Sequence, residues 1–252
     1  MGALGLNQRA TVGVREVTQI ENGTVMYFLK ASLGFWVLAM VLAGSQLEAT
    51  PASVENDPDC KQLNWGPYDP KPGHPTAAER QAFVDQIKPI AQEAEQRFKV
   101  PAAAIAAMAI QESGYGYTRT ALNANNLFGY KWTPHGSGDR GRYMLTCQPA
   151  SDPGKEYIVF KDYRDAVLFV SERLAKSSHY QNATMAYASI PSDRRTKGDV
   201  ISWVSAIAKA GYNCCPQKYE KQITRAMNSP MSPSDHESAD NLYLLSIKAS
   251  NP

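Results

Sequence analysis

Glu112 is the side chain with the clearest potential for acid chemistry. It follows Ile105 and Met108 at helical spacing, which places it on the apolar face of a helix predicted to begin at Pro101. A carboxyl group at the C-terminal end of that helix is partly removed from water and faces the negative end of the helix dipole. Both effects favour the protonated form and raise its pKa. Such an acid can protonate the oxygen that leaves when a glycosidic bond breaks. Periodicity alone still favours a plainer interpretation, a solvated structural glutamate in the last turn.

The elements that must position Glu112 are predicted to be helical. The run AAAIAAMAIQE after Pro101 consists of strong helix formers. Gly114 and Gly116 end this helix and are expected to leave the approach to Glu112 open. Apolar residues also recur at helical spacing over 76–98, where Pro89 is expected to kink or break the helix.

The remaining patterns predict one mainly α-helical domain with a small β-hairpin insertion. Helical spacing returns over 167–174, 200–210 and 219–227, and the runs RYMLT and EYIVF within 130–159 are typical of a hairpin. We expect the domain to span 76–228.

The segments outside this domain carry other signals. Residues 50–75 are rich in proline, which predicts a linker arm. Residues 229–252 form a polar, Ser/Pro-rich tail that we expect to be mobile. Residues 1–49 contain ASLGFWVLAMVLA, an uncharged run after Lys30 with small residues following it, which is the pattern of a secretory signal. The run is shorter than the roughly 20 residues that span a bilayer. We therefore predict export to the periplasm, cell envelope or medium. An uncleaved anchor is the alternative, and Met26 is a plausible true start.

Export would allow the four cysteines to form disulfides. Adjacent cysteines pair poorly with each other, so Cys214 and Cys215 are each expected to reach Cys60 or Cys147. Free buried thiols are the alternative interpretation. The cysteines lack the paired spacing of a zinc site.

The stretch 104–132 resembles the core motif of glycoside hydrolase family 73, the bacterial β-N-acetylglucosaminidases that cut peptidoglycan. In that motif an apolar helix ends in a glutamate, followed by Ser-Gly-aromatic-Gly, then Asn-Leu-Phe-Gly and a lysine. Residues 112–116, 126–129 and Lys131 match it in order. The segment 159–174 resembles the family's Phe-x-x-Tyr helix start. The segment 206–223 resembles its Gly-Tyr-x-x-x-Pro-x-Tyr stretch, with one extra residue.

The resemblance implies a lysozyme-like helical fold and a role for particular residues. Glu112 would be the general acid, and Tyr219 matches a tyrosine that the family keeps beside the site. The substrate-binding residues implied by the resemblance are Tyr115, Asn126, Phe128, Gly129 and Tyr130. Core packing is the alternative for the aromatic members of this set, above all for Phe128.

The chain departs from the family at the hairpin, where a second acidic residue often stands. The corresponding position is Cys147, and the nearest carboxylates are Asp139, Asp152 and Glu156. Glu156 lies in the alternating run EYIVF and is the candidate for a displaced second carboxylate; the alternative is an exposed hairpin charge. Glu112 would otherwise work alone, with the acetamido oxygen of the substrate as internal nucleophile.

Composition excludes other classes of function. Lys and Arg number 26 against 24 Asp and Glu, a net charge of +2, which argues against a nucleic-acid binder. No metal site or cofactor is predicted, because the histidines are scattered in loop-like sequence and are expected to be solvated: His74, His135, His179 and His236. The expected partner is the peptidoglycan glycan strand, with cell-envelope machinery as a further candidate, and the chain is expected to be a monomer.

Three functions fit these observations. The first is an exported peptidoglycan hydrolase that cleaves the β-1,4 bond after N-acetylglucosamine, an endo-β-N-acetylglucosaminidase. The second is a lytic transglycosylase that uses Glu112 alone and leaves an anhydro-muramyl end. The third is a non-catalytic peptidoglycan-binding or assembly protein, which the missing hairpin acid supports.

Overall fold

The computed structural model describes residues 64–228 and 241–247. The predicted signal segment within 1–49 and Cys60 lie outside the described residues. In the described part the chain forms helices and one small antiparallel sheet, and none of those helices has both the length and the apolar character needed to cross a membrane.

The helices follow one another with a single hairpin inserted among them. The longer helices are α2 (Ala77–Phe98), α3 (Ala102–Ser113), α4 (Arg119–Ala124), α5 (Tyr163–Lys176), α6 (Gln181–Ala188), α7 (Lys197–Ile207) and α8 (Pro216–Met227). The π-helical turn η2 (Ala208–Tyr212) follows α7, and the 3-10 turn η3 (Leu242–Leu245) lies near the C-terminus. Strands β1 (Arg142–Met144) and β2 (Glu156–Ile158) pair antiparallel with Tyr143 opposite Tyr157. The predicted mainly α fold with a β-hairpin insertion is confirmed.

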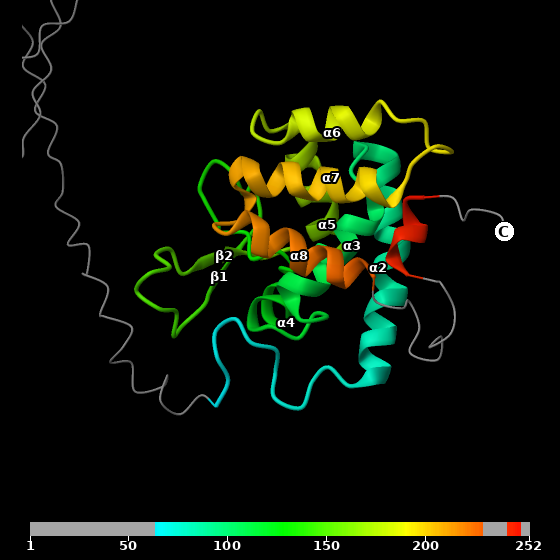
Figure 1. Cartoon of the computed structure of the whole chain (residues 1–252). Coiled ribbons are helices and arrows are strands. Elements are labelled where there is room, and N and C mark those ends of the chain that lie inside the picture. Colours follow the sequence, from blue (N-terminus) through cyan, green and yellow to red (C-terminus); the bar gives the residue numbers. More distant parts are fainter. Residues whose placement is uncertain (1–63, 229–240, 248–252) are drawn as a thin grey trace, which may run out of the picture. The chain divides into compact units, whose positions relative to one another are not determined.

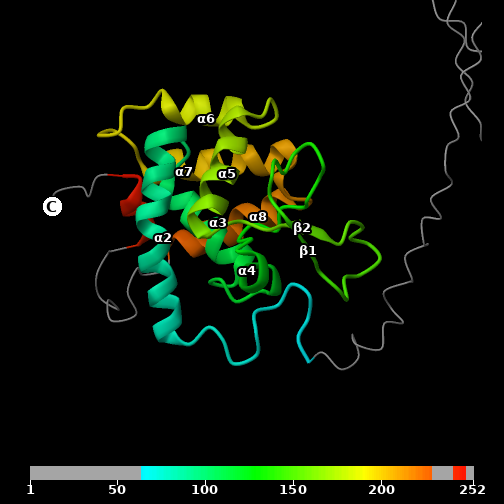
Figure 2. The same ribbon diagram turned by 180° about the vertical axis from the view of Figure 1, so that it is seen from behind.

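Helix α3 forms the centre of the molecule, with α2, α5, α7 and α8 packed around it (Figures 1 and 2). Every side chain of α3 from Ala102 to Ile110 is buried. A helix that is apolar on all sides is stable only when other elements cover it all round. The many alanines of α3 keep it thin, which lets its neighbours approach closely. Burial of α3 fixes the position of its C-terminal end, where Glu112 lies.

Helix α2 begins at a capping box and runs through Pro89 without interruption. The Thr76 hydroxyl accepts a hydrogen bond from the Glu79 backbone, and the Glu79 carboxylate accepts one from the Thr76 backbone. Of the two expected effects of Pro89, a kink or a break, the break does not occur. Packing of α2 against α3 and α5 on either side of the proline holds the helix together despite one missing backbone hydrogen bond.

Glu95 connects four parts of the fold from the C-terminal end of α2. Its carboxylate accepts hydrogen bonds from the Ala102 backbone at 2.8 Å, the Ser246 hydroxyl at 2.8 Å and the Tyr187 hydroxyl at 2.7 Å. It also pairs with the Arg195 guanidinium at 2.5 Å, and both side chains are about nine-tenths buried. A carboxylate satisfied in this way is stable in the interior, and it ties α3, α6, η3 and the loop before α7 to one point.

The C-terminal tail contains a buried element that the sequence pattern did not predict. Leu242 and Tyr243 of η3 are buried, and the Ser246 hydroxyl accepts a hydrogen bond from the Ala103 backbone at the start of α3. This part of the tail therefore belongs to the core, contrary to the expectation of a polar, mobile tail. The short helices α4 and α6 were also not predicted, because neither has enough turns to show a clear apolar period.

Candidate active site

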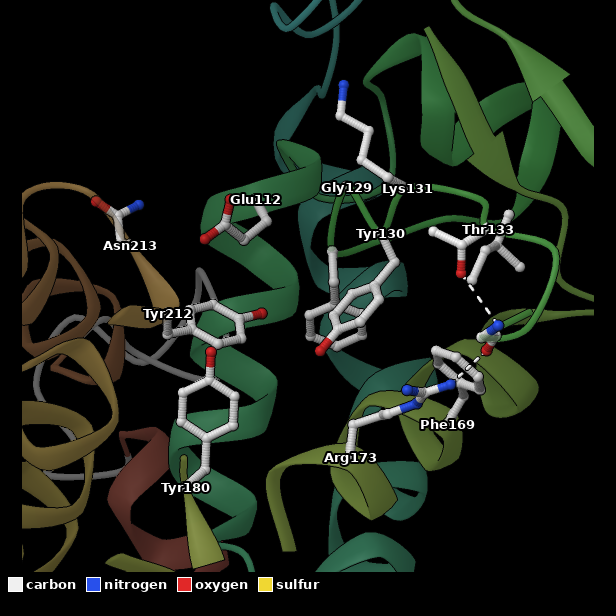
Figure 3. A pocket seen from close by; sticks show the side chains of 13 residues that line it. Glu112, Gly129, Tyr130, Lys131, Thr133, Phe169, Arg173, Tyr180, Tyr212 and Asn213 are labelled. Atoms are coloured by element: carbon white, nitrogen blue, oxygen red, sulfur yellow. Dashed lines mark hydrogen bonds between the residues drawn. The ribbon is translucent and has the colours of Figure 1, made fainter. Parts of the chain in front are cut away.

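A pocket of about 470 Å³ opens beside the C-terminal end of α3. Figure 3 shows Glu112 at its edge, facing aromatic side chains that come from several elements. The lining residues are Glu112, Phe128, Gly129, Tyr130, Lys131, Thr133, Gly136, Ile158, Phe169, Arg173, Tyr180, Tyr212 and Asn213. Glu112 is the single carboxylate in this lining. The pocket therefore combines one acid with flat apolar surfaces.

Glu112 lies in the last turn of α3, where the side chain is half-buried. Burial removes water from the carboxyl group and raises its pKa above the ordinary value. The Tyr219 hydroxyl acts in the opposite direction and lowers the pKa, but its effect is the smaller of the two. The predicted direction of the shift is confirmed, and desolvation is its main cause. A larger share of Glu112 is therefore protonated near neutral pH than of an exposed glutamate.

The two glycines after Glu112 do not open the approach to it, contrary to the prediction. Gly114 ends α3 in a left-handed conformation, and a Cβ atom there would lie 2.5 Å from Pro70 of the N-terminal arm. A Cβ atom at Gly116 would lie 2.7 Å from the Tyr163 hydroxyl. Both glycines are needed for tight packing and positive φ angles rather than for access. Glu112 is instead open to the pocket that Phe128 to Lys131 line.

Asn126 shapes the pocket floor from behind and does not line it. Its side-chain amide donates to the Tyr130 and Ile158 carbonyl oxygens, each at 2.9 Å, and its carbonyl oxygen accepts from the Tyr130 backbone at 3.0 Å. The side chain is fully buried. These bonds hold the turn 126–130 in place, so Phe128, Gly129 and Tyr130 face the pocket as predicted. Gly129 has φ +62°, a conformation that favours glycine.

Aromatic rings form the pocket walls, and most of them were not predicted as site residues. Tyr130 packs edge-on against Phe169 of α5 with ring centroids 5.6 Å apart. On the other side Tyr180 packs edge-on against Tyr212 with centroids 6.1 Å apart (Figure 3). Tyr212 belongs to the Gly-Tyr motif and thus had a sequence signal. Phe169 and Tyr180 had none, because only helix packing brings them to Glu112.

Two tyrosine hydroxyl groups near Glu112 are buried without a hydrogen-bond partner. They belong to Tyr212, which lines the pocket, and Tyr219 of α8, which is buried just behind it. The two rings are 5.6 Å apart. Burial and the nearby carboxyl group raise the pKa of each tyrosine well above its ordinary value, so both hydroxyl groups keep their protons. An unsatisfied buried hydroxyl group is costly, and here a bound ligand or water would supply the partner.

The hairpin carboxylates do not reach the pocket with Glu112. Glu156 pairs with Arg142 at 2.7 Å, and Asp139 is exposed. Asp152 accepts from the Lys131 ammonium at 3.0 Å and from the Tyr68 hydroxyl at 2.6 Å. None of the three lines the pocket. Glu156 therefore helps to hold the hairpin, and Asp152 connects it to the arm.

Tyr115 contributes to a different pocket. Its ring lies on the other side of the end of α3, packed edge-on against Phe83 at 6.0 Å. Tyr115 has a positive φ and is absent from the lining of the pocket that contains Glu112. Of the predicted substrate-binding residues, the structure thus gathers Phe128, Gly129 and Tyr130 around Glu112, and places Asn126 behind them and Tyr115 elsewhere.

The cysteines differ from the predicted arrangement. Cys214 and Cys215 are exposed free thiols whose sulfur atoms are 2.9 Å apart, so neither forms the expected long-range disulfide. Both residues are exposed and lie just before α8. Cys147, in a left-handed conformation, is not among the free thiols.

Among the residues that the structure describes, His, Cys, Asp and Glu side chains form no cluster that could hold a metal ion. His74 is not solvated as expected. Its ring stacks on Tyr117 at 5.0 Å and pairs with the Glu79 carboxylate at 2.8 Å. His236 lies outside the described residues.

The family model named glucosaminidase, described as mannosyl-glycoprotein endo-β-N-acetylglucosaminidase, matches residues 88–231. This match spans more than half of the chain and includes the end of α3, the hairpin and α8. The chain belongs to the glucosaminidase family. It is therefore a glycoside hydrolase, and the half-buried acid of its pocket is the kind of group that such chemistry requires.

Solved structures similar to this chain include proteins from Sphingomonas, Salmonella and Listeria. A peptidoglycan hydrolase mutant from Sphingomonas sp. A1 is 22% identical, with a TM-score of 0.45, and the match covers 59% of this chain and 93% of that one. The glycoside hydrolase domain of Salmonella typhimurium FlgJ is 21% identical, with a TM-score of 0.44 and coverage of 58% and 85%. The catalytic domain of the Listeria monocytogenes autolysin Auto is 17% identical, with a TM-score of 0.46 and coverage of 79% and 98%. No curated protein matches the glucosaminidase in sequence.

Proposed function

We propose that this glucosaminidase is an exported peptidoglycan hydrolase that cleaves the β-1,4 glycosidic bond after N-acetylglucosamine, with Glu112 as general acid. One observation carries the proposal: in a chain of the glucosaminidase family, the aromatic pocket contains one carboxyl group, and burial raises its pKa. Export is supported by the signal-like segment over 31–43. Peptidoglycan as substrate is supported by the motif resemblance, and the similar protein from Sphingomonas is named a peptidoglycan hydrolase.

The first chemical step uses the proton of Glu112. The N-acetylglucosamine ring lies against the aromatic wall that contains Tyr130, with its glycosidic oxygen next to the Glu112 carboxyl group. As the bond between the sugar C1 atom and that oxygen breaks, the proton moves from Glu112 to the oxygen, which leaves as a hydroxyl group. Glu112 becomes a carboxylate at this stage.

The second part of the reaction requires a nucleophile at C1, and the pocket lining offers no second carboxylate. The acetamido oxygen of the substrate itself fills this role and forms a cyclic oxazolinium intermediate. Water then attacks C1 and gives its proton to Glu112, which restores the acid. The unpartnered hydroxyl group of Tyr212, which lines the pocket, would donate to the substrate or to this water.

We propose that Cys147 forms its disulfide with Cys60. Two of the four cysteines, Cys214 and Cys215, are free, and Cys147 is not. Such a bond would connect the hairpin to the N-terminal arm and is compatible with an oxidising compartment outside the cytoplasm. Cys147 would then stabilise the hairpin at the position where related chains often carry an acid.

The test of the general acid compares Glu112→Gln with the wild type on purified peptidoglycan. The amide has the shape of the acid but no transferable proton, so we expect turnover to fall by at least about 10²-fold while the circular dichroism spectrum is unchanged. Glu172→Gln is the matched control, because this exposed glutamate pairs with Lys176 and does not line the pocket. Full activity of Glu112→Gln would refute the assignment.

A further inference from the structure

A second pocket, of about 590 Å³, lies on the other side of the C-terminal end of α3. Four segments surround it: the arm contributes Pro70, α2 contributes Arg80, the end of α3 contributes Gln111, and α8 contributes Gln222 and Arg225. In Figure 1 the arm, drawn in cyan, passes from the hairpin side to the foot of α2. The reaction described above makes no use of this pocket.

The two charged residues that line the second pocket, Arg80 and Arg225, are both positive. The Arg80 guanidinium lies 5.6 Å from the centre of the Tyr115 ring. A shallower pocket of about 430 Å³ on α8 shares Gln222 and Arg225 with it and adds Lys218 and Lys221. Neither lining includes an Asp or Glu residue. In a chain with a net charge of only +2, this concentration of cations favours an anionic ligand.

The wall that the arm provides is held in place before any ligand binds. The Lys71 backbone donates to the Tyr117 carbonyl oxygen at 2.9 Å, and His74 stacks on the Tyr117 ring. Pro70 packs against Gly114 so closely that a side chain there would collide with it. A preformed wall lowers the entropy cost of binding, because the arm need not become ordered at that step.

The second pocket adjoins the active site through two shared helices. On α3, Gln111 lines the second pocket and the next residue, Glu112, lines the first. On α8, Tyr219 lies behind Glu112, and Gln222, one turn later, lines the second pocket. The two pockets thus meet at neighbouring residues of α3, so a branched ligand bound at the end of this helix would contact the linings of both.

We propose that the second pocket binds the carboxylate groups of the peptide stem that peptidoglycan carries, while the glycan strand occupies the pocket of Glu112. This inference rests on the proposed function. The N-acetylglucosamine beside the cleaved bond is uncharged. The negative charge of the substrate lies on the peptide stem, which carries carboxylates together with peptide groups. Arg80 of the second pocket and Lys221 of the shallower pocket beside it suit the carboxylates, and the amides of Gln111 and Gln222 suit the peptide groups.

The kinetic test compares two substrates: soluble glycan chains that carry stems, and the same chains after an amidase has removed the stems. For the double variant Arg80→Gln/Lys221→Gln we expect KM on the stem-bearing chains to rise about tenfold, with no change on the bare chains. Lys88→Gln is the control, because this lysine of α2 lines neither pocket. An equal change on both substrates, or no change on either, would overturn the proposal.

A binding test separates this inference from the proposed function. Calorimetry measures the binding of a synthetic stem tetrapeptide with free carboxylates, the same peptide with its carboxylates amidated, and an oligomer of glycerol phosphate. We expect the wild type to bind the free-acid peptide and the double variant to bind it at least about tenfold more weakly. Binding of the phosphate oligomer alone, or equal binding of both peptides, would refute the stem site. Failure of the wild type to cleave either glycan would refute the proposed function but leave this binding result intact.

Discussion

The Tyr219 hydroxyl group lies beside the Glu112 carboxyl group, which connects α8 to the end of α3. The Tyr219 hydroxyl acts on the carboxyl group as a hydrogen-bond donor, although the contact falls outside strict hydrogen-bond geometry. It lowers the pKa of Glu112, whereas burial raises it more. The acid strength of Glu112 is thus the balance of two effects that come from different helices.

Removal of the Tyr219 hydroxyl should shift the pH dependence of catalysis. Turnover requires protonated Glu112, so the rate falls as the pH rises through the pKa of that group. In Tyr219→Phe the lowering effect is absent, and we expect the falling limb of the kcat profile to move to higher pH with less than about a tenfold change in maximal kcat. Tyr243→Phe, which also removes a buried unpartnered hydroxyl group but far from the pocket lining, serves as control. A limb that moves to lower pH would contradict this account.

Glu112 should also reduce the stability of the fold at high pH. Its pKa is higher in the folded state than in the unfolded state, so its favourable contribution is complete at low pH and is lost as the pH rises through the folded pKa. Glu112→Gln imitates the protonated form at every pH. At pH 8 we expect its melting temperature to exceed that of the wild type by a few degrees, because each kcal/mol of added unfolding free energy raises the melting temperature by about 2–4 °C. Near pH 4 we expect the two melting temperatures to be equal. Scanning calorimetry at both pH values measures this difference, and a lower melting temperature at pH 8 would contradict it.

The Glu95 cluster should carry much of the stability of the helical domain. Glu95→Ala leaves Arg195 buried without its carboxylate and removes the acceptor of the Ala102 backbone and of Ser246. Loss of one partner from a buried pair costs about 3–5 kcal/mol. Urea unfolding measures this change. Glu93→Ala, which breaks exposed ion pairs with Arg97 and Arg164, should cost no more than about 1 kcal/mol. Similar losses in both variants would argue against a special role for Glu95.

The cysteine assignment predicts a simple labelling pattern. Alkylation of the native, unreduced protein should modify two thiols, Cys214 and Cys215, and alkylation after reduction should modify four. Peptide mass spectrometry identifies the modified residues. Four modified cysteines without reduction would refute the proposed bond between Cys147 and Cys60.

Sequence patterns predicted the parts of the fold that depend on long local signals. The position of α3 followed from a run of apolar helix formers between Pro101 and Gly114, and this run also placed Glu112. The opposite wall was not predictable, because Tyr180 lies in a short irregular segment between α5 and α6. Its place beside Tyr212 is set by packing of helices that are distant in sequence. The hydrogen bonds of Asn126 likewise depend on the hairpin, which provides the Ile158 carbonyl oxygen. Only the structure therefore shows that Asn126 supports the pocket floor from behind and does not line the pocket.

Errors of prediction had equally specific causes. Pro89 weakens a helix locally, but packing on both sides of α2 outweighs that loss. The tail contains Leu242 and Tyr243, and two apolar residues are too few to show a period, although the core buries both. Gly114 and Gly116 allow either an open approach or tight packing, and the choice depends on Pro70 and Tyr163, which lie far away in sequence.

The central claim, cleavage after N-acetylglucosamine by Glu112, is tested most directly by the chemistry of the product ends. Purified peptidoglycan is digested with the wild type and with Glu112→Gln, and the fragments are analysed by mass spectrometry after borohydride reduction. We predict fragments with reducing N-acetylglucosamine ends from the wild type and none from the variant. Anhydro-muramyl ends, or the same N-acetylglucosamine ends from the variant, would contradict the account.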